Sequence, residues 1–169
     1  SRDAGGTWQV LREGLEMDVH QVATHLSNPS QVIAATASGF YLSDDYGHTF
    51  ICQSGGMSYH YQRACACFAD SDVYLVSTSR GPHDQADALL YRSDNAGRDW
   101  DLAEGLPENI GKNIDTFLIV VVDGGHALVI IEDTDLTTSA VCLFALLFRI
   151  DIPVAVLVCA GAVSYTHLR

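Results

Sequence analysis

The sequence predicts an all-β fold, and three observations support this prediction. One eight-residue pattern, in which turn-forming residues end in an aromatic side chain, occurs at residues 1–8, 43–50 and 93–100. The starts of these copies are 42 and 50 residues apart, a spacing typical of stacked repeats of β-sheet. Between the copies, short runs of β-branched and aromatic residues alternate with Gly, Pro, Asn and Asp, as strands alternate with turns.

We call the eight-residue pattern, S-x-[DN]-x-G-x-[TD]-[WF], the box. Its Ser and its Asp or Asn can hydrogen-bond to the backbone a few residues further on. Its Gly supplies a positive φ, and its aromatic ring can pack beneath the turn. We therefore predict a structural role for Ser1, Asp3, Gly5 and Trp8 in the first box, Ser43, Asp45, Gly47 and Phe50 in the second, and Ser93, Asn95, Gly97 and Trp100 in the third.

The elements between the boxes follow from the same patterns. In chain order, strands are expected over residues 8–11, 31–36, 39–42, 72–78, 88–92 and 100–102. Turns are expected at residues 14–15, 28–30, 70–72 and 105–107. The middle repeat is longer because it carries an insertion at residues 80–87. Insertions in repeat arrays fall in loops on one face, which is often the binding face.

The box resembles the Asp-box, or BNR repeat, of sialidases, sortilin-type receptors, xyloglucan-active glycosidases and many bacterial proteins. The resemblance covers about residues 1–130. It implies a β-propeller in which each box is the hairpin turn between the third and fourth strands of a blade, away from the catalytic face. This chain departs from the pattern in having Phe50 for Trp, Asn95 for Asp and Asp99 for Thr.

Together these features predict a partial β-propeller of about three four-stranded blades over residues 1–130. A closed propeller has about 4–8 blades, and the chain of 169 residues begins inside a box. We therefore expect it to be part of a longer propeller. An open stack of blades leaves sheet edges unpaired, which favours association.

Residues 131–169 form an atypical apolar tail in which the box pattern does not continue. A membrane span over residues 140–163 is one interpretation, but Arg149, Asp151 and Pro153 lie at its centre. One central charge costs about 2.5–3.5 kcal/mol on insertion, which argues against a span. A pair of buried strands is the second interpretation. The third, which we favour, is non-native or frame-shifted sequence, because residues 163–169 resemble sequencing-adaptor read-through in metagenomic proteins.

Composition excludes several classes of function. The net charge is −12, and nine Lys and Arg residues form no basic stripe, which argues against nucleic-acid binding. Five Cys residues without framework spacing argue against a disulfide-stapled secreted module and favour the cytoplasm, although the localisation stays open. His and Cys do not occur at metal-binding spacings, so no metal and no other cofactor is expected.

The middle repeat supplies the candidate ligand site. Tyr59 and His60 lie in one connection, at residues 54–61, and Arg80 and His83 lie in the insertion. A propeller can place both connections at one rim, where aromatic, His and Arg groups suit a polar ligand such as a glycan, or a protein.

The predicted function is that of a scaffold that binds a ligand or a protein, with no catalytic residues identified. The alternative is a BNR-type glycoside hydrolase, similar to an exo-sialidase, whose catalytic residues lie mostly outside this chain. Whether the protein is an enzyme stays open, because function depends on sites rather than on the fold.

Overall fold

The computed structural model of the chain describes residues 1, 3–82 and 86–103 and four further strands within residues 118–160. In these residues all regular elements are β-strands, which confirms the predicted all-β class. The strands are β1 (Val19–Thr24), β2 (Val32–Thr36), β3 (Phe40–Ser43), β4 (Ile51–Cys52), β5 (Tyr61–Cys67), β6 (Tyr74–Ser79), β7 (Leu89–Ser93), β8 (Asp101–Leu102), β9 (Leu118–Val122), β10 (His126–Asp133), β11 (Cys142–Arg149) and β12 (Ile152–Ala160).

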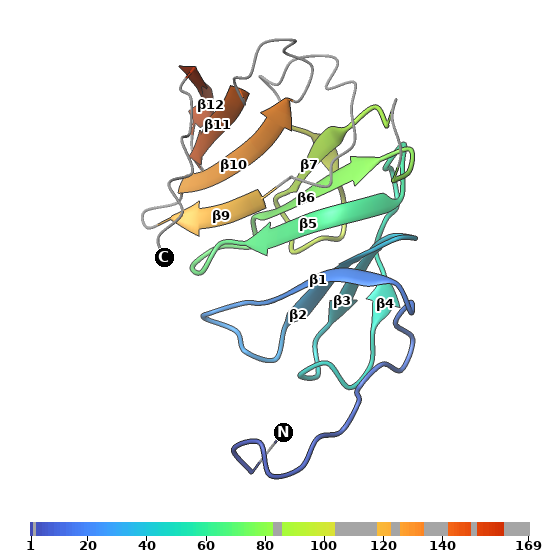
Figure 1. Ribbon diagram of the computed structural model, residues 1–169. Helices are drawn as coiled ribbons and strands as arrows, with labels where there is room; N and C mark the ends of the chain where they lie inside the picture. Colours follow the sequence, from blue (N-terminus) through green and yellow to red (C-terminus); the bar gives the residue numbers. More distant parts are fainter. Residues whose placement is uncertain are drawn as a thin grey trace, which may run out of the picture.

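These strands form four-stranded antiparallel sheets in which sequence neighbours pair with each other (Figure 1). The first sheet has the order β1-β2-β3-β4 and the second has the order β5-β6-β7-β8. The third has the order β12-β11-β10-β9. Each sheet is therefore a simple meander.

The first strands of the three sheets lie next to each other. β5 contacts β1 and β2 on one side and β9 on the other (Figure 1). We call β1, β5 and β9 the inner strands. The short strands β4 and β8 lie at the opposite edges of the first two sheets, and their residues are exposed.

Each sheet has two distinct ends. The second and third boxes connect β3 to β4 and β7 to β8, so we call their end the box end. The box ends of the first two sheets are adjacent, because Ser27 Oγ in the β1–β2 turn donates to Asp70 Oδ1 in the β5–β6 turn at 2.9 Å. The opposite end carries the β2–β3, β4–β5 and β6–β7 connections and the start of each inner strand.

The main hydrophobic core lies between the first and second sheets. Side chains of β2 and β3 face those of β5, β6 and β7, and a tryptophan from the third box closes the cluster. Its members are Ile33, Ala35, Phe40, Leu42, Met57, Cys65, Tyr74, Val76, Tyr91, Ala96 and Trp100.

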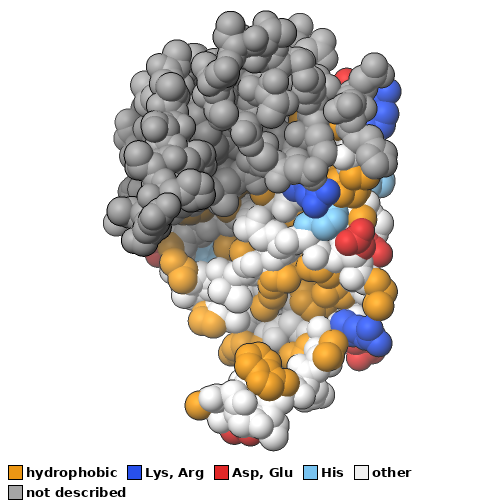
Figure 2. All heavy atoms as spheres, viewed as in Figure 1, with side chains coloured by type: hydrophobic (Ala, Val, Ile, Leu, Met, Phe, Trp, Pro, Cys, Tyr) orange, Lys and Arg blue, Asp and Glu red, His pale blue; other side chains and the backbone are white. Residues whose placement is uncertain are grey.

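The strand predicted over residues 8–11 is wrong, because none of these residues is in a strand. A strand needs a hydrogen-bonded neighbour, and the first bridge after this segment is an isolated one between Glu13 and Thr49, outside the named strands. Trp8 is 82% exposed as a result. Figure 2 shows hydrophobic side chains on the surface of this lower part of the molecule, where Val10 is exposed as well.

The predicted domain boundary at residue 130 falls inside β10, which pairs with β11 on one side and β9 on the other. The non-native origin of residues 131–169 stays a prediction. Among the residues that the structure describes, there is no helix of the length and hydropathy needed to cross a membrane.

Candidate functional site

The second box closes its turn with its own side chains. Ser43 Oγ donates to Asp45 Oδ1 at 2.7 Å and accepts the N–H of Gly47 at 2.9 Å. Asp45 then accepts the backbone N–H of Thr49 at 2.8 Å and its hydroxyl at 2.6 Å. The first box repeats these contacts with Ser1, Asp3, Gly5 and Thr7. These carboxylates serve the turn, so the box is a poor place to look for catalysis.

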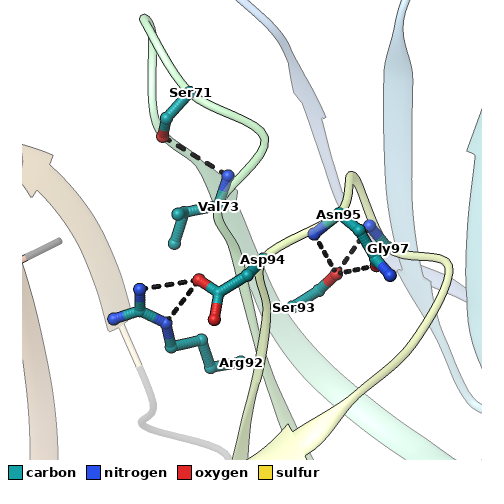
Figure 3. A network of polar contacts seen from close by, with 7 residues as sticks. All are labelled: Ser71, Val73, Arg92, Ser93, Asp94, Asn95 and Gly97. Atoms are coloured by element: carbon teal, nitrogen blue, oxygen red, sulfur yellow. Dashed lines mark hydrogen bonds and ion pairs between the residues drawn. The ribbon is translucent and has the colours of Figure 1, made fainter.

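The third box makes the same turn with one hydrogen bond reversed. Ser93 Oγ again contacts the side chain two residues on and accepts the N–H of Gly97 at 2.8 Å (Figure 3). However, Asn95 Nδ2 donates to Asp99 Oδ2 at 2.8 Å, whereas in the second box the later residue donates. The substitutions Asp→Asn and Thr→Asp therefore compensate each other.

Replacing Asn95 with Asp tests this compensation. The change would put two carboxylates where an amide now donates to Asp99 at 2.8 Å. We expect a loss of about 1 kcal/mol in the free energy of unfolding at neutral pH, because the pair is exposed and solvent screens the repulsion. Urea unfolding would measure it. The double variant Asn95→Asp/Asp99→Thr recreates the second box and should recover most of the loss; no recovery would contradict the reversed bond.

The carboxylate of the second box should titrate at unusually low pH. Hydrogen bonds from the hydroxyl and then the N–H of Thr49 lower the pKa of Asp45 from 3.8 to about 2. Because this pKa is lower in the folded state, the stabilisation is present above about pH 4 and is lost as the pH falls through about 2. We expect the Thr49 amide proton to shift in NMR with a midpoint near 2. Asp45→Asn should abolish this transition, and a midpoint near 4 would refute it.

At the opposite end, the structure brings together two of the four predicted ligand residues. The Tyr59 ring lies 5.5 Å from Arg80 Cζ, and Arg80 Nη2 donates to Tyr59 Oη at 3.1 Å. Arg80 also forms an ion pair with Asp87, to which Tyr59 donates at 3.3 Å. We call Tyr59, Arg80 and Asp87 the rim triad. It joins the β4–β5 connection to the β6–β7 connection.

Electrostatics and backbone geometry both fix the rim triad. The hydrogen bond to Tyr59 and the charge of Asp87 raise the pKa of Arg80 above its ordinary value, so the guanidinium stays charged. The N–H of Arg80 donates to the carbonyl of Ala86 at 2.7 Å, which closes the insertion at its base. Of the other predicted ligand residues, His60 is exposed beside Tyr59, and His83 lies outside the described residues.

A second polar cluster at this end was not predicted. It comes from the inner strands β1 and β5. The His20 and Tyr61 rings are 4.9 Å apart, and Arg63 Cζ lies 5.0 Å from the centroid of the Tyr61 ring. His20 Nε2 is 3.4 Å from Asp18 Oδ1, and Nδ1 contacts the carbonyl of Gln62. We call Asp18, His20, Tyr61 and Arg63 the inner cluster.

The two cysteines of β5 do not add a reactive site. Burial raises the pKa of Cys65 to about 12 and that of Cys67 to about 11, which keeps both thiols protonated. In the described parts of the chain, His, Cys, Asp and Glu do not gather in a group that could hold a metal ion.

Comparison with known proteins identifies the fold. No protein-family model matches the chain, and no curated protein matches it. Among solved structures, an ancestral GH74 enzyme is similar, with a TM-score of 0.67 and 16% sequence identity. The likeness covers 92% of this chain and 21% of that enzyme, which is a glycoside hydrolase with a propeller fold. At this identity the likeness shows a propeller-like fold and nothing about activity.

Proposed function

We propose that the chain forms about three blades of a β-propeller and acts as a ligand-binding scaffold. The likeness to a propeller enzyme and the adjacent inner strands support the propeller. In this arrangement each four-stranded sheet is a blade, and each box is the turn between its third and fourth strands. The end opposite the boxes then holds the ligand.

The rim triad is the observation that carries this proposal. It combines an aromatic ring, a guanidinium and a carboxylate from two connections that are far apart in sequence. Such a set can both donate and accept hydrogen bonds to a polar ligand, and the Tyr ring supplies an apolar surface. The polar groups of the boxes bond within single turns, whereas those of the rim triad link two connections at the opposite end. We therefore propose a polar ligand, such as a glycan or a protein, at the opposite end.

A glycan array with the full chain tests this function. Arg80→Met keeps the aliphatic stem but removes the charge that contacts Tyr59 and Asp87. We expect it to weaken binding of the best glycan at least tenfold. Arg98→Met, at an exposed box position, is the matched control and should leave binding unchanged. Equal losses in both variants, or no glycan bound at all, would contradict glycan binding at this end.

Glycoside hydrolysis is the second candidate, because the similar solved structure is a GH74 enzyme. Hydrolysis of the usual kind needs two carboxyl groups, about 5–5.5 Å apart for retention and about 6.5–9.5 Å for inversion. Asp18 and Asp87 supply carboxylates at the opposite end. Release of 4-nitrophenol from a panel of aryl glycosides, abolished by Asp18→Asn or Asp87→Asn, would support it. No release from any member of the panel would count against it.

A further inference from the structure

We propose that the inner cluster is a subsite for a neutral saccharide. This rests on the proposed function, because it assigns the ligand class and a second set of contacts at the same end. The cluster lies on the inner strands, whereas the rim triad lies on the connections. Its residues come from β1, from β5 and from the residue immediately before β1.

A β-bulge in the first sheet places His20 in the cluster. Val19 pairs with Thr36 and Gln21 pairs with Ala35, so His20 is an extra residue in β1. A bulge turns a side chain away from the regular alternation of a strand. Here the extra residue directs the imidazole toward the neighbouring inner strand, where it meets the Tyr61 ring.

A second bulge occupies the equivalent place in the next sheet. Between the pairs Gln62–Thr78 and Cys65–Val76, β5 has two residues and β6 has one. Arg63 is the first of these two residues, so it corresponds to His20 of β1. The regular pairing of β1 with β2 and that of β5 with β6 are thus each interrupted near the start of the inner strand. At each interruption, the inner strand contributes a nitrogen-containing side chain to the inner cluster.

The freed backbone groups of the second bulge have dedicated partners. Ser77 is a fully buried residue of β6, and its Oγ accepts the N–H of Ala64 at 3.0 Å. The N–H of Cys65 donates across the sheet interface to Gln21 Oε1 at 3.1 Å. A buried N–H group left unpaired is costly, so these two side chains stabilise the bulge. The bulge is therefore a built feature, and it holds Arg63 in place.

The chemistry of the cluster fits hydroxyl groups better than an anion. Arg63 can donate hydrogen bonds, Asp18 accepts them, and Tyr61 adds a ring that is partly exposed. His20 shapes the cluster through its ring, because its two nitrogens already contact Asp18 and the carbonyl of Gln62. Beside them, Glu16 Oε1 accepts the N–H of Asp18 at 3.3 Å, while the buried Oε2 has no hydrogen-bond partner among the residues that the structure describes. A sugar hydroxyl both donates and accepts, so it can satisfy such a mixed set. An anionic ligand would meet Asp18 in a chain whose net charge is −12.

Calorimetry of the full chain with defined saccharides tests the proposal. The probes are the neutral cellotetraose and mannotetraose and the anionic tetragalacturonate. We expect a neutral tetrasaccharide to bind at least tenfold more tightly than the anionic one. Asp18→Asn, which changes an exposed carboxylate with little change of shape, and Arg63→Met should each weaken binding at least tenfold. Asp70→Asn and Arg98→Met, at the box end, are the matched controls and should bind as the unchanged protein does.

The outcomes separate this proposal from the function on which it rests. If Arg80→Met weakens binding but Asp18→Asn and Arg63→Met do not, the inner cluster is not a subsite and the scaffold function stands. Tighter binding of tetragalacturonate would overturn the neutral class. Binding of no saccharide would overturn the subsite and glycan binding together. Near-UV circular dichroism confirms folding of each variant, and if Arg63→Met is unfolded, Asp18→Asn decides because its side chain is 66% exposed.

Discussion

Replacing Trp100 with Ala is expected to lower the free energy of unfolding by about 3–5 kcal/mol, the range for removing a large aromatic from a core. Trp100 ends the third box, but it packs on the neighbouring sheet. Its ring lies 4.8 Å from that of Phe40 in an edge-to-face arrangement, and its Nε1 donates to the carbonyl of Gln53 at 2.8 Å. The substitution would remove both contacts and leave a cavity between the two sheets.

The repeat supplies a control at the same box position. Trp8 is 82% exposed whereas Trp100 is 6% exposed, so Trp8→Ala should change stability by less than about 0.5 kcal/mol. Urea unfolding followed by far-UV circular dichroism compares the two. Trp100→Phe keeps a ring and removes only the N–H donor, so its loss should be intermediate. Equal effects of Trp100→Ala and Trp8→Ala would show that the box aromatic does not hold the sheets together.

Replacing Gly97 with Ala should cost about 2–4 kcal/mol, from backbone strain and overpacking combined. Gly97 has a φ of +79°, which residues with a Cβ adopt only at a cost. A Cβ here would also lie 2.9 Å from Phe40 Cε1 and 3.4 Å from Trp100 and Tyr74. Phe40 and Tyr74 are fully buried, so neither ring can move away without disturbing the core.

Gly47, at the same position of the second box, separates the two causes. Its φ is +82°, but the nearest atom to a Cβ there is Phe50 Cζ at an ordinary 3.6 Å. Gly47→Ala should therefore show the backbone cost alone, about 1 kcal/mol. The difference between the two variants in thermal or urea unfolding measures the steric part. A Gly97→Ala variant no less stable than Gly47→Ala would mean that the interface between the sheets is loosely packed.

The sequence predicted well those parts of the fold that local patterns determine. The strand expected over residues 39–42 is β3 (Phe40–Ser43), and the one expected over 88–92 is β7 (Leu89–Ser93). Both lead directly into a box whose Ser, Gly and aromatic residues specify a turn. The runs expected over residues 31–36 and 72–78 likewise correspond to β2 and β6, which are mostly buried.

The inner strands β1 and β5 were not predicted, although they hold the sheets together. Their sequences contain His, Gln and Arg in place of a continuous apolar run, and β1 has no fully buried residue. These polar residues are accommodated by contacts with distant parts of the chain, such as Gln21 with the N–H of Cys65. The bulges depend on the register against β2 and β6, and the sequence of one strand does not determine that register.

The candidate ligand site was predictable only in part. Tyr59 and Arg80 come together because the β4–β5 and β6–β7 connections lie at the same end of the meanders. In the sequence, the insertion at residues 80–87 distinguished the second of these connections. Asp87 completes the triad but looks like any loop carboxylate in the sequence. It has a φ of +46°, and it is brought to Arg80 by the closure of the insertion at Ala86.

The reversed hydrogen bond of the third box has a consequence for how such repeats diverge. The third and seventh positions carry Asp with Thr in one box and Asn with Asp in another, and either combination supplies one donor and one acceptor. Asp at both positions would supply no donor. The two sites should therefore covary across related chains, and the intermediate with Asp at both positions would be selected against. A repeat that has drifted in this way keeps its turn while losing its consensus letters, so it would escape any profile that scores each column independently.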